Sequence, residues 1–159
     1  MFQIISDTSY AAWVREDWGW PFALTLHAFG TAVVVGLIFI IALRLAGLFR
    51  TIPYTSLLRL IPVIWAGVAV QVYSGFTLWT SKPDKYFADG LFLWKFSLVI
   101  VGVVLTIYFQ KLLKREVGGW EAAGKVSQRG LQMVAITSLA WAAVLVAGRL
   151  TAYLGTLYG

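Results

Sequence analysis

The chain has 159 residues, of which 60% are apolar and only 13% are charged, with a net charge of +6. A soluble domain carries about 25% charged residues, and a chain of this size cannot bury so much apolar surface from water. These numbers exclude an ordinary soluble protein and predict a chain that faces lipid. The lack of cysteine excludes disulfides, iron–sulfur clusters and thiolate metal sites. The single histidine, His27, excludes a multi-histidine metal site within one protomer.

The N-terminal segment, residues 1–18, lacks the basic start and the uninterrupted apolar core of a cleavable signal peptide. It predicts instead a short amphipathic helix on the membrane surface, with Phe2, Ile5, Trp13 and Val14 in contact with lipid. We therefore expect the first membrane helix to be retained in the mature protein.

Four apolar segments follow, each near or above the roughly 20 residues that a helix needs to cross the hydrocarbon. They lie at about residues 20–49, 57–80, 91–113 and 130–158. They show no two-residue alternation and are joined by short links, which favours helices in an up-down-up-down bundle. The sequence thus predicts an all-α membrane protein, with one transmembrane domain over residues 1–159 and a short N-terminal interfacial helix.

The positions of lysine and arginine predict the orientation of this bundle. The first link, between the spans at 20–49 and 57–80, is flanked by Arg44, Arg50 and Arg59. The third link and its flank hold Lys111, Lys114, Arg115, Lys125 and Arg129. Because positive charge gathers on the cytoplasmic side, we expect both termini in the periplasm of a bacterial inner membrane. Aromatic residues near the opposite boundary agree with this: Trp13, Trp18, Trp20, Trp79, Trp94, Tyr86, Tyr153 and Tyr158.

Each predicted helix carries a polar residue in its outer half. His27 and Lys95 lie roughly 9 Å from the outer ends of their helices and Arg149 roughly 12 Å, at about 1.5 Å per residue. Gln71 lies somewhat deeper. Charges at this depth are costly and usually mark function, and the spans contain no acidic residue that could neutralise them. We expect the counter-charge from a bound anion, a lipid phosphate, or a carboxylate of the second link.

Purely structural roles stay open for the same residues. Lys95 could snorkel to the outer surface, Arg149 could cap backbone carbonyls, and His27 could hydrogen-bond to a neighbouring helix. At the inner ends, Arg44 and Arg59 are close enough to the surface to snorkel.

The functional alternative is a haem b site. A neutral His27 imidazole can ligate iron, and Gly30, one turn later, would leave room for the flat ring. Lys95 and Arg149 would then meet the propionates. Met133, near the inner end of its helix, is at the wrong depth to supply the sixth ligand. A quinone headgroup or a lipid is the alternative occupant, and the binding candidates are His27, Gly30, Gln71, Lys95 and Arg149.

A resemblance to a known family covers about residues 18–157. It rests on WPFALTLHAFGTAVVVGLIFIIALRLAGL, LIPVIWAG, FLWKFSL and AGRLTAY. These stretches resemble an uncharacterised family of bacterial four-helix membrane proteins with a domain of unknown function. The likeness implies that His27, Lys95 and Arg149 belong to a shared pattern, and it implies no activity. A shorter His-x-x-Gly stretch is similar to copper-resistance D-type and related haem-handling membrane families, whose further histidines this chain lacks.

Three functions agree with these features. The first is a redox subunit that holds haem b or a quinone in its periplasmic half and exchanges electrons with a periplasmic protein. The second is an accessory or structural subunit of a larger membrane complex, whose cations hold lipid or a partner's carboxylates. A small anion transporter ranks last, because a membrane carboxylate for proton coupling is missing. We expect membrane lipid, further copies or other membrane subunits as partners, no nucleic acid, and no independent enzyme.

Overall fold

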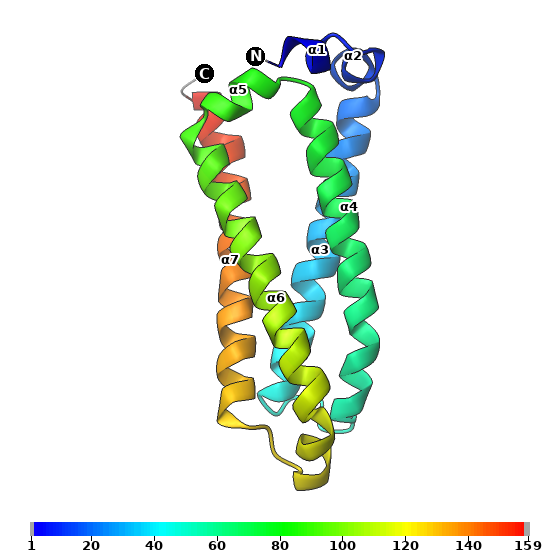
Figure 1. The fold of residues 1–159 in the computed structure, drawn as a ribbon, viewed down its shortest axis with the longest axis vertical. Helices are drawn as coiled ribbons and strands as arrows, with labels where there is room; N and C mark the ends of the chain where they lie inside the picture. Colours follow the sequence, from blue (N-terminus) through cyan, green and yellow to red (C-terminus); the bar gives the residue numbers. More distant parts are fainter. Residues whose placement is uncertain (1, 158–159) are drawn as a thin grey trace.

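The computed structural model describes residues 2–157, and four long helices make up most of this range (Figure 1). They are α3 (Gly19–Leu45), α4 (Ile61–Thr80), α6 (Gly90–Ala123) and α7 (Gln128–Leu157). The chain has four helical segments that are long and apolar enough to cross a membrane. The prediction of an all-helical protein with four candidate membrane spans is confirmed for the described residues.

The first two predicted spans differ from the helices at the link between them. α3 ends at Leu45, not at residue 49, because Gly47 and Phe49 adopt left-handed backbone angles, with φ of 102° and 52°. The link then forms a 3-10 helix, η1 (Tyr54–Leu60), which leads directly into α4. The second span therefore starts as a 3-10 helix and becomes α-helical only at Ile61.

The third helix continues ten residues beyond its predicted end at residue 113 and takes up most of the expected third link. Gly118 and Gly119 fall within the expected link, and both lie on the exposed side of α6. Val117 and Trp120 are buried in the core on the other side, so tertiary packing outweighs the low helix propensity of glycine. The helix ends where Gly124 adopts a left-handed conformation.

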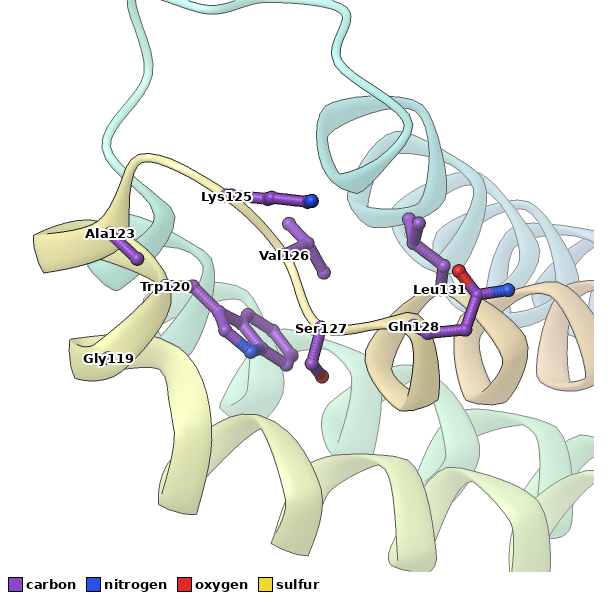
Figure 2. Close-up of a pocket in the computed structure, with 8 residues that line it drawn as sticks. All are labelled: Gly119, Trp120, Ala123, Lys125, Val126, Ser127, Gln128 and Leu131. Atoms are coloured by element: carbon purple, nitrogen blue, oxygen red, sulfur yellow. The ribbon is translucent and has the colours of Figure 1, made fainter.

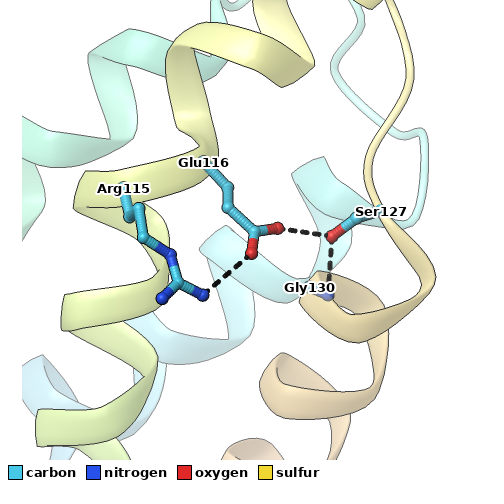
Figure 3. A network of polar contacts seen from close by, with 4 residues as sticks. All are labelled: Arg115, Glu116, Ser127 and Gly130. Atoms are coloured by element: carbon cyan, nitrogen blue, oxygen red, sulfur yellow. Dashed lines mark hydrogen bonds and ion pairs between the residues drawn. The ribbon is translucent and has the colours of Figure 1, made fainter.

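The turn from α6 into α7 is held by a small polar network (Figure 3). The Ser127 hydroxyl accepts from the backbone N–H of Gly130 and donates to a Glu116 carboxylate oxygen 2.8 Å away. Arg115 pairs with the other oxygen at 3.3 Å. Gly130 also makes room for Trp120, because a Cβ at this glycine would lie 2.6 Å from Cζ2 of the indole. α7 begins at Gln128, two residues before the start that we predicted for the fourth span. The predicted end of this span, residue 158, lies outside the described residues.

The N-terminal segment forms two short helices, α1 (Gln3–Ser6) and α2 (Ser9–Glu16), where one was predicted. Val14, expected in lipid, is fully buried. Its backbone lies against Gly19 at the start of α3, so closely that a Cβ on this glycine would be 2.7 Å from the Val14 Cα. The Tyr10 hydroxyl is hydrogen-bonded to the Thr77 hydroxyl of α4 at 2.7 Å. α2 is therefore packed onto the bundle.

α3 packs against α4 and α7, and α6 packs against α7. Figure 1 shows α1, α2 and α5 (Pro83–Ala88) together at one end of the bundle, called the upper end here, and the α6–α7 turn at the lower end. In the upper half the ribbons of α4 and α6 diverge, whereas they approach each other in the lower half. There Trp65 of α4 donates a hydrogen bond to Gln110 of α6 at 2.6 Å.

The apolar core lies mainly in the lower half and middle of the bundle. Its most buried side chains include Val34, Ile38, Ile41, Leu57, Ile64, Phe109, Leu113 and Trp141. No residue between 90 and 101 of α6 is buried. On the upper half of α4 the buried side chains are polar, namely Ser74, Thr77 and Thr80. The lower half is thus closed by apolar packing, and the upper half holds the polar groups.

Candidate functional site

His27 lies on α3 and faces α4. Its Nδ1 is 2.9 Å from the hydroxyl oxygen of Ser74. The Ser74 hydroxyl donates its single hydrogen to the Val70 carbonyl at 2.7 Å, so its oxygen is left to accept from the ring. The ring also lies beside Gly75, where a Cβ would be 3.4 Å from Cε1. The contact between Nδ1 and the Ser74 hydroxyl favours a neutral imidazole, with the hydrogen on Nδ1 and an acceptor at Nε2.

Gln71 lies about one turn below Ser74 on α4 and reaches the same imidazole. When its amide is turned so that the oxygen accepts from the Thr31 hydroxyl, its nitrogen lies 3.1 Å from His27 Nε2 and 2.7 Å from Nδ1. The Thr31 hydroxyl is also 2.8 Å from the His27 carbonyl oxygen. Ser74 and Gln71 together can therefore satisfy both nitrogens of the ring. We call these four residues the α3–α4 polar network.

Gly30 brings the two helices together just below this network. A Cβ there would lie 3.0 Å from Cγ of Gln71 and 3.1 Å from the carbonyl oxygen of Gly67. Gly67 in turn makes room for Val33 and Val34, whose side chains would be 3.0 and 2.9 Å from its Cβ. Small residues allow such close helix approach in membranes. The structure therefore gives Gly30 a packing role, in place of the open space for a haem ring that we expected beside it.

Lys95 lies on the upper part of α6 and is half-buried. Its aliphatic end packs beside α7, where a Cβ on Gly148 would be 3.7 Å from Cε and 3.8 Å from Nζ. The ammonium group is close enough to His27 to interact with it electrostatically. Lys95 makes no ion pair with any carboxylate in the described part of the chain. Asp89, a possible counter-charge, instead caps α6 by accepting from the N–H of Leu91 at 2.9 Å.

Arg149 follows Gly148 on α7 and is exposed on the surface of the chain. The structure thus brings His27, Gly30 and Gln71 into contact and places Lys95 within electrostatic range of His27. Arg149 makes no hydrogen bond or ion pair with these residues in the described part of the chain. No cluster of three or more metal-ligating side chains occurs within the described residues.

Sequence reasoning missed two members of the polar network, Thr31 and Ser74. A signal for each was present, because Thr31 follows His27 by four residues and Ser74 follows Gln71 by three. Residues at these spacings share one face of a helix. Read together, the two spacings would have indicated that the polar faces of α3 and α4 meet.

Comparison with known proteins gives no match: no protein family, no curated protein and no solved structure is significantly similar to this chain. The family resemblance drawn from the sequence therefore stays a prediction, and the function must be argued from the site.

Proposed function

We propose that this chain is a multi-pass subunit of a bacterial inner membrane that binds a quinone headgroup in its upper half. The headgroup would lie between the α3–α4 polar network and Lys95, and the subunit would pass electrons between the quinone and a periplasmic partner. The observation that carries the proposal is Lys95, a half-buried cation within electrostatic range of the His27 imidazole. It makes no ion pair with a carboxylate of the described residues.

The charge distribution supports an up-down-up-down bundle with the upper end in the periplasm. Cations at the lower end are Arg44, Arg50, Arg59, Lys111, Lys114, Arg115, Lys125 and Arg129, against the two carboxylates of Glu116 and Glu121. By the positive-inside rule this end belongs in the cytoplasm. The termini and the candidate site then belong to the periplasmic half.

Quinone carbonyl oxygens are hydrogen-bond acceptors, and they become more negatively charged on reduction. An ammonium group is a donor and a compensating charge at once, so Lys95 suits both states. The Gln71 amide can exchange its contact with the His27 ring for a hydrogen bond to a quinone carbonyl. The exposed apolar side chains along upper α6, such as Phe96 and Ile100, supply a surface for an isoprenoid tail.

Haem b is the weaker candidate for the same residues. Iron ligation needs a ring nitrogen of His27, and side chains of α4 contact both of them. The space beside Gly30 is filled by α4 as well. If haem is bound, Gln71 must first move away from Nε2, after which Lys95 and Arg149 would be the partners for the propionates.

Binding of a short-chain quinone to the detergent-purified protein tests the proposal, with tryptophan fluorescence as the signal. Lys95→Met removes the cation and is expected to weaken binding about tenfold or more, the scale of one lost charged hydrogen bond. Lys111→Met is the matched control, because Lys111 is an exposed cation on the same helix in the lower half. Equal affinities for both variants, or binding that never saturates, would refute a site at Lys95.

A non-redox accessory subunit is the second candidate, and the polar network itself favours it. His27 can be satisfied entirely by α4, as expected of a side chain that joins two helices. In that case His27→Ala would lower stability without affecting any ligand, and affinity purification under mild conditions would recover a stoichiometric membrane partner.

A further inference from the structure

The lower end of the bundle contains a second polar region, an open pocket of about 490 Å³. It lies where the end of α3 meets the turn between α6 and α7. Its charged lining consists of Arg44, Arg50, Lys125 and Glu121. An adjoining pocket of about 450 Å³, drawn in Figure 2, shares Lys125, Val126 and Leu131 with it.

Arg44 is the buried member of this lining, with only 5% of its surface exposed. The side chain therefore reaches the link at the end of α3, where other residues cover most of it. Its Nε donates to the Ile52 carbonyl at 2.5 Å, and its guanidinium lies 3.8 Å from the centroid of the Tyr54 ring. In the part of the chain that the structure describes, its two terminal nitrogens make no hydrogen bond and no ion pair.

Most of the Arg44 side chain is buried, while its terminal nitrogens keep contact with the open pocket. Burying most of a charged side chain without a carboxylate partner costs free energy. The carbonyl of Ile52 and the face of Tyr54 compensate for part of this cost. The four N–H donors of the terminal nitrogens of Arg44 are still available. An anion in the pocket would satisfy them.

Glu121 is the pocket's only carboxylate among the described lining residues, and it is already engaged. It accepts from the backbone N–H of Thr55 at 2.9 Å and from the Thr55 hydroxyl at 3.2 Å. The three cations therefore exceed the negative charge of the lining, and Arg50 and Lys125 are its exposed cations.

We propose that this pocket binds a phosphate group, with Arg44 as the anchor and Arg50 and Lys125 at the entrance. The planar fork of arginine matches phosphate oxygens in pairs. Basic pockets between membrane helices on the cytoplasmic side are typical sites for anionic lipid headgroups. A phospholipid headgroup and a soluble phosphate share this chemistry, and the proposal is independent of the quinone site.

The competing explanation is that these cations serve only to orient the chain in the membrane. Two other cations at the same end, Arg59 and Lys114, are exposed and do not line the pocket. Removing them lowers the net charge by the same amount as removing Arg50 and Lys125, so they provide a matched control.

The experiment measures the thermal unfolding midpoint of the delipidated full-length protein in a nonionic detergent. It is titrated with inorganic phosphate, with micelles containing phosphatidylglycerol, and with phosphatidylcholine micelles as the reference. We expect a saturable rise in the midpoint with one of the two anionic probes. The Arg50→Gln/Lys125→Gln variant should need about tenfold more of the probe, and the Arg59→Gln/Lys114→Gln variant should behave like the unmodified protein.

Stabilisation by inorganic phosphate identifies a soluble phosphate group as ligand, and stabilisation by phosphatidylglycerol alone identifies a lipid headgroup; both support the proposal. The proposal is overturned if neither probe stabilises the protein, or if the two double variants lose affinity for the probe equally. Arg44→Lys keeps the charge but removes the paired donors, and it should weaken binding in the same direction. Because Arg50 and Lys125 are exposed, their replacement tests the pocket even if Arg44→Lys does not fold.

Discussion

The imidazole Nδ1 of His27 lies 2.9 Å from the hydroxyl oxygen of Ser74, although 47 positions separate the two residues in the sequence. This contact joins α3 to α4 in the half of the bundle where apolar packing is sparse. Gln71 and Thr31 extend it into the α3–α4 polar network. The stability of the upper half should therefore depend on polar contacts more than on core volume.

Ser74→Ala should lower the free energy of unfolding by about 0.6 to 1.7 kcal/mol, the range measured for hydrogen bonds between membrane helices. It leaves a ring nitrogen of His27 without its partner. The measurement is unfolding in mixed detergent micelles containing increasing SDS. Ser97→Ala is the control, because the exposed Ser97 hydroxyl donates to the Leu93 carbonyl within its own helix. A loss no larger than that of Ser97→Ala would contradict a stabilising role for the network.

Gly30→Ala should destabilise the bundle by about 1 to 3 kcal/mol, the usual cost of overpacking. Its Cβ would approach the backbone of Gly67, which cannot move aside as a flexible side chain can. Gly36→Ala on the same helix meets nothing within 4 Å and should be neutral or stabilising, since alanine favours helix. The same unfolding assay compares the two. Equal stabilities would mean that α3 and α4 do not approach as closely as the structure has them.

Thr106→Val should cost about 1 to 3 kcal/mol because it leaves a buried donor unsatisfied. The Trp141 indole N–H donates to the Thr106 hydroxyl at 2.9 Å, and both side chains are buried. Trp141→Phe removes the donor, so Thr106→Val made in that background should cost clearly less. A double-mutant cycle measures this coupling, and additive losses would argue against the hydrogen bond.

The topology can be tested by single cysteines, because the chain has none of its own. Lys85→Cys on α5 at the upper end and Ala122→Cys at the lower end both replace exposed residues. We expect a membrane-impermeant maleimide to label residue 85 once the outer membrane is permeable, and residue 122 only after the inner membrane is opened. The reverse pattern would place the candidate site in the cytoplasmic half.

Length and hydropathy were enough to predict the four spans, because each apolar segment is long enough for a membrane helix and shows no two-residue alternation. They were not enough for the helix ends. The apolar segment ends at residue 113, but Val117 and Trp120 beyond it are buried in the core, and the helix continues to Ala123. Local propensity carries no information about this tertiary packing.

The polar site could be predicted in part, because a polar or ionisable side chain within a span costs free energy and so marks a position of interest. His27, Gln71 and Lys95 were found in this way. Their partners were not, since hydropathy does not show which faces of two helices meet. For the same reason the sequence showed only that Arg44 is close enough to the surface to snorkel, and the fold shows that its guanidinium lies over the Tyr54 ring.

The most direct test of the central claim is the redox difference spectrum of the detergent-purified protein, recorded in the ultraviolet and visible before and after chemical reduction. We expect a quinone absorbance in the ultraviolet that disappears on reduction, no Soret band, and loss of the quinone signal in Lys95→Met but not in Lys111→Met. A Soret band that shifts on reduction would establish haem instead. A spectrum unchanged by reduction in both regions, from protein purified without delipidation, would contradict the quinone site and leave the accessory subunit.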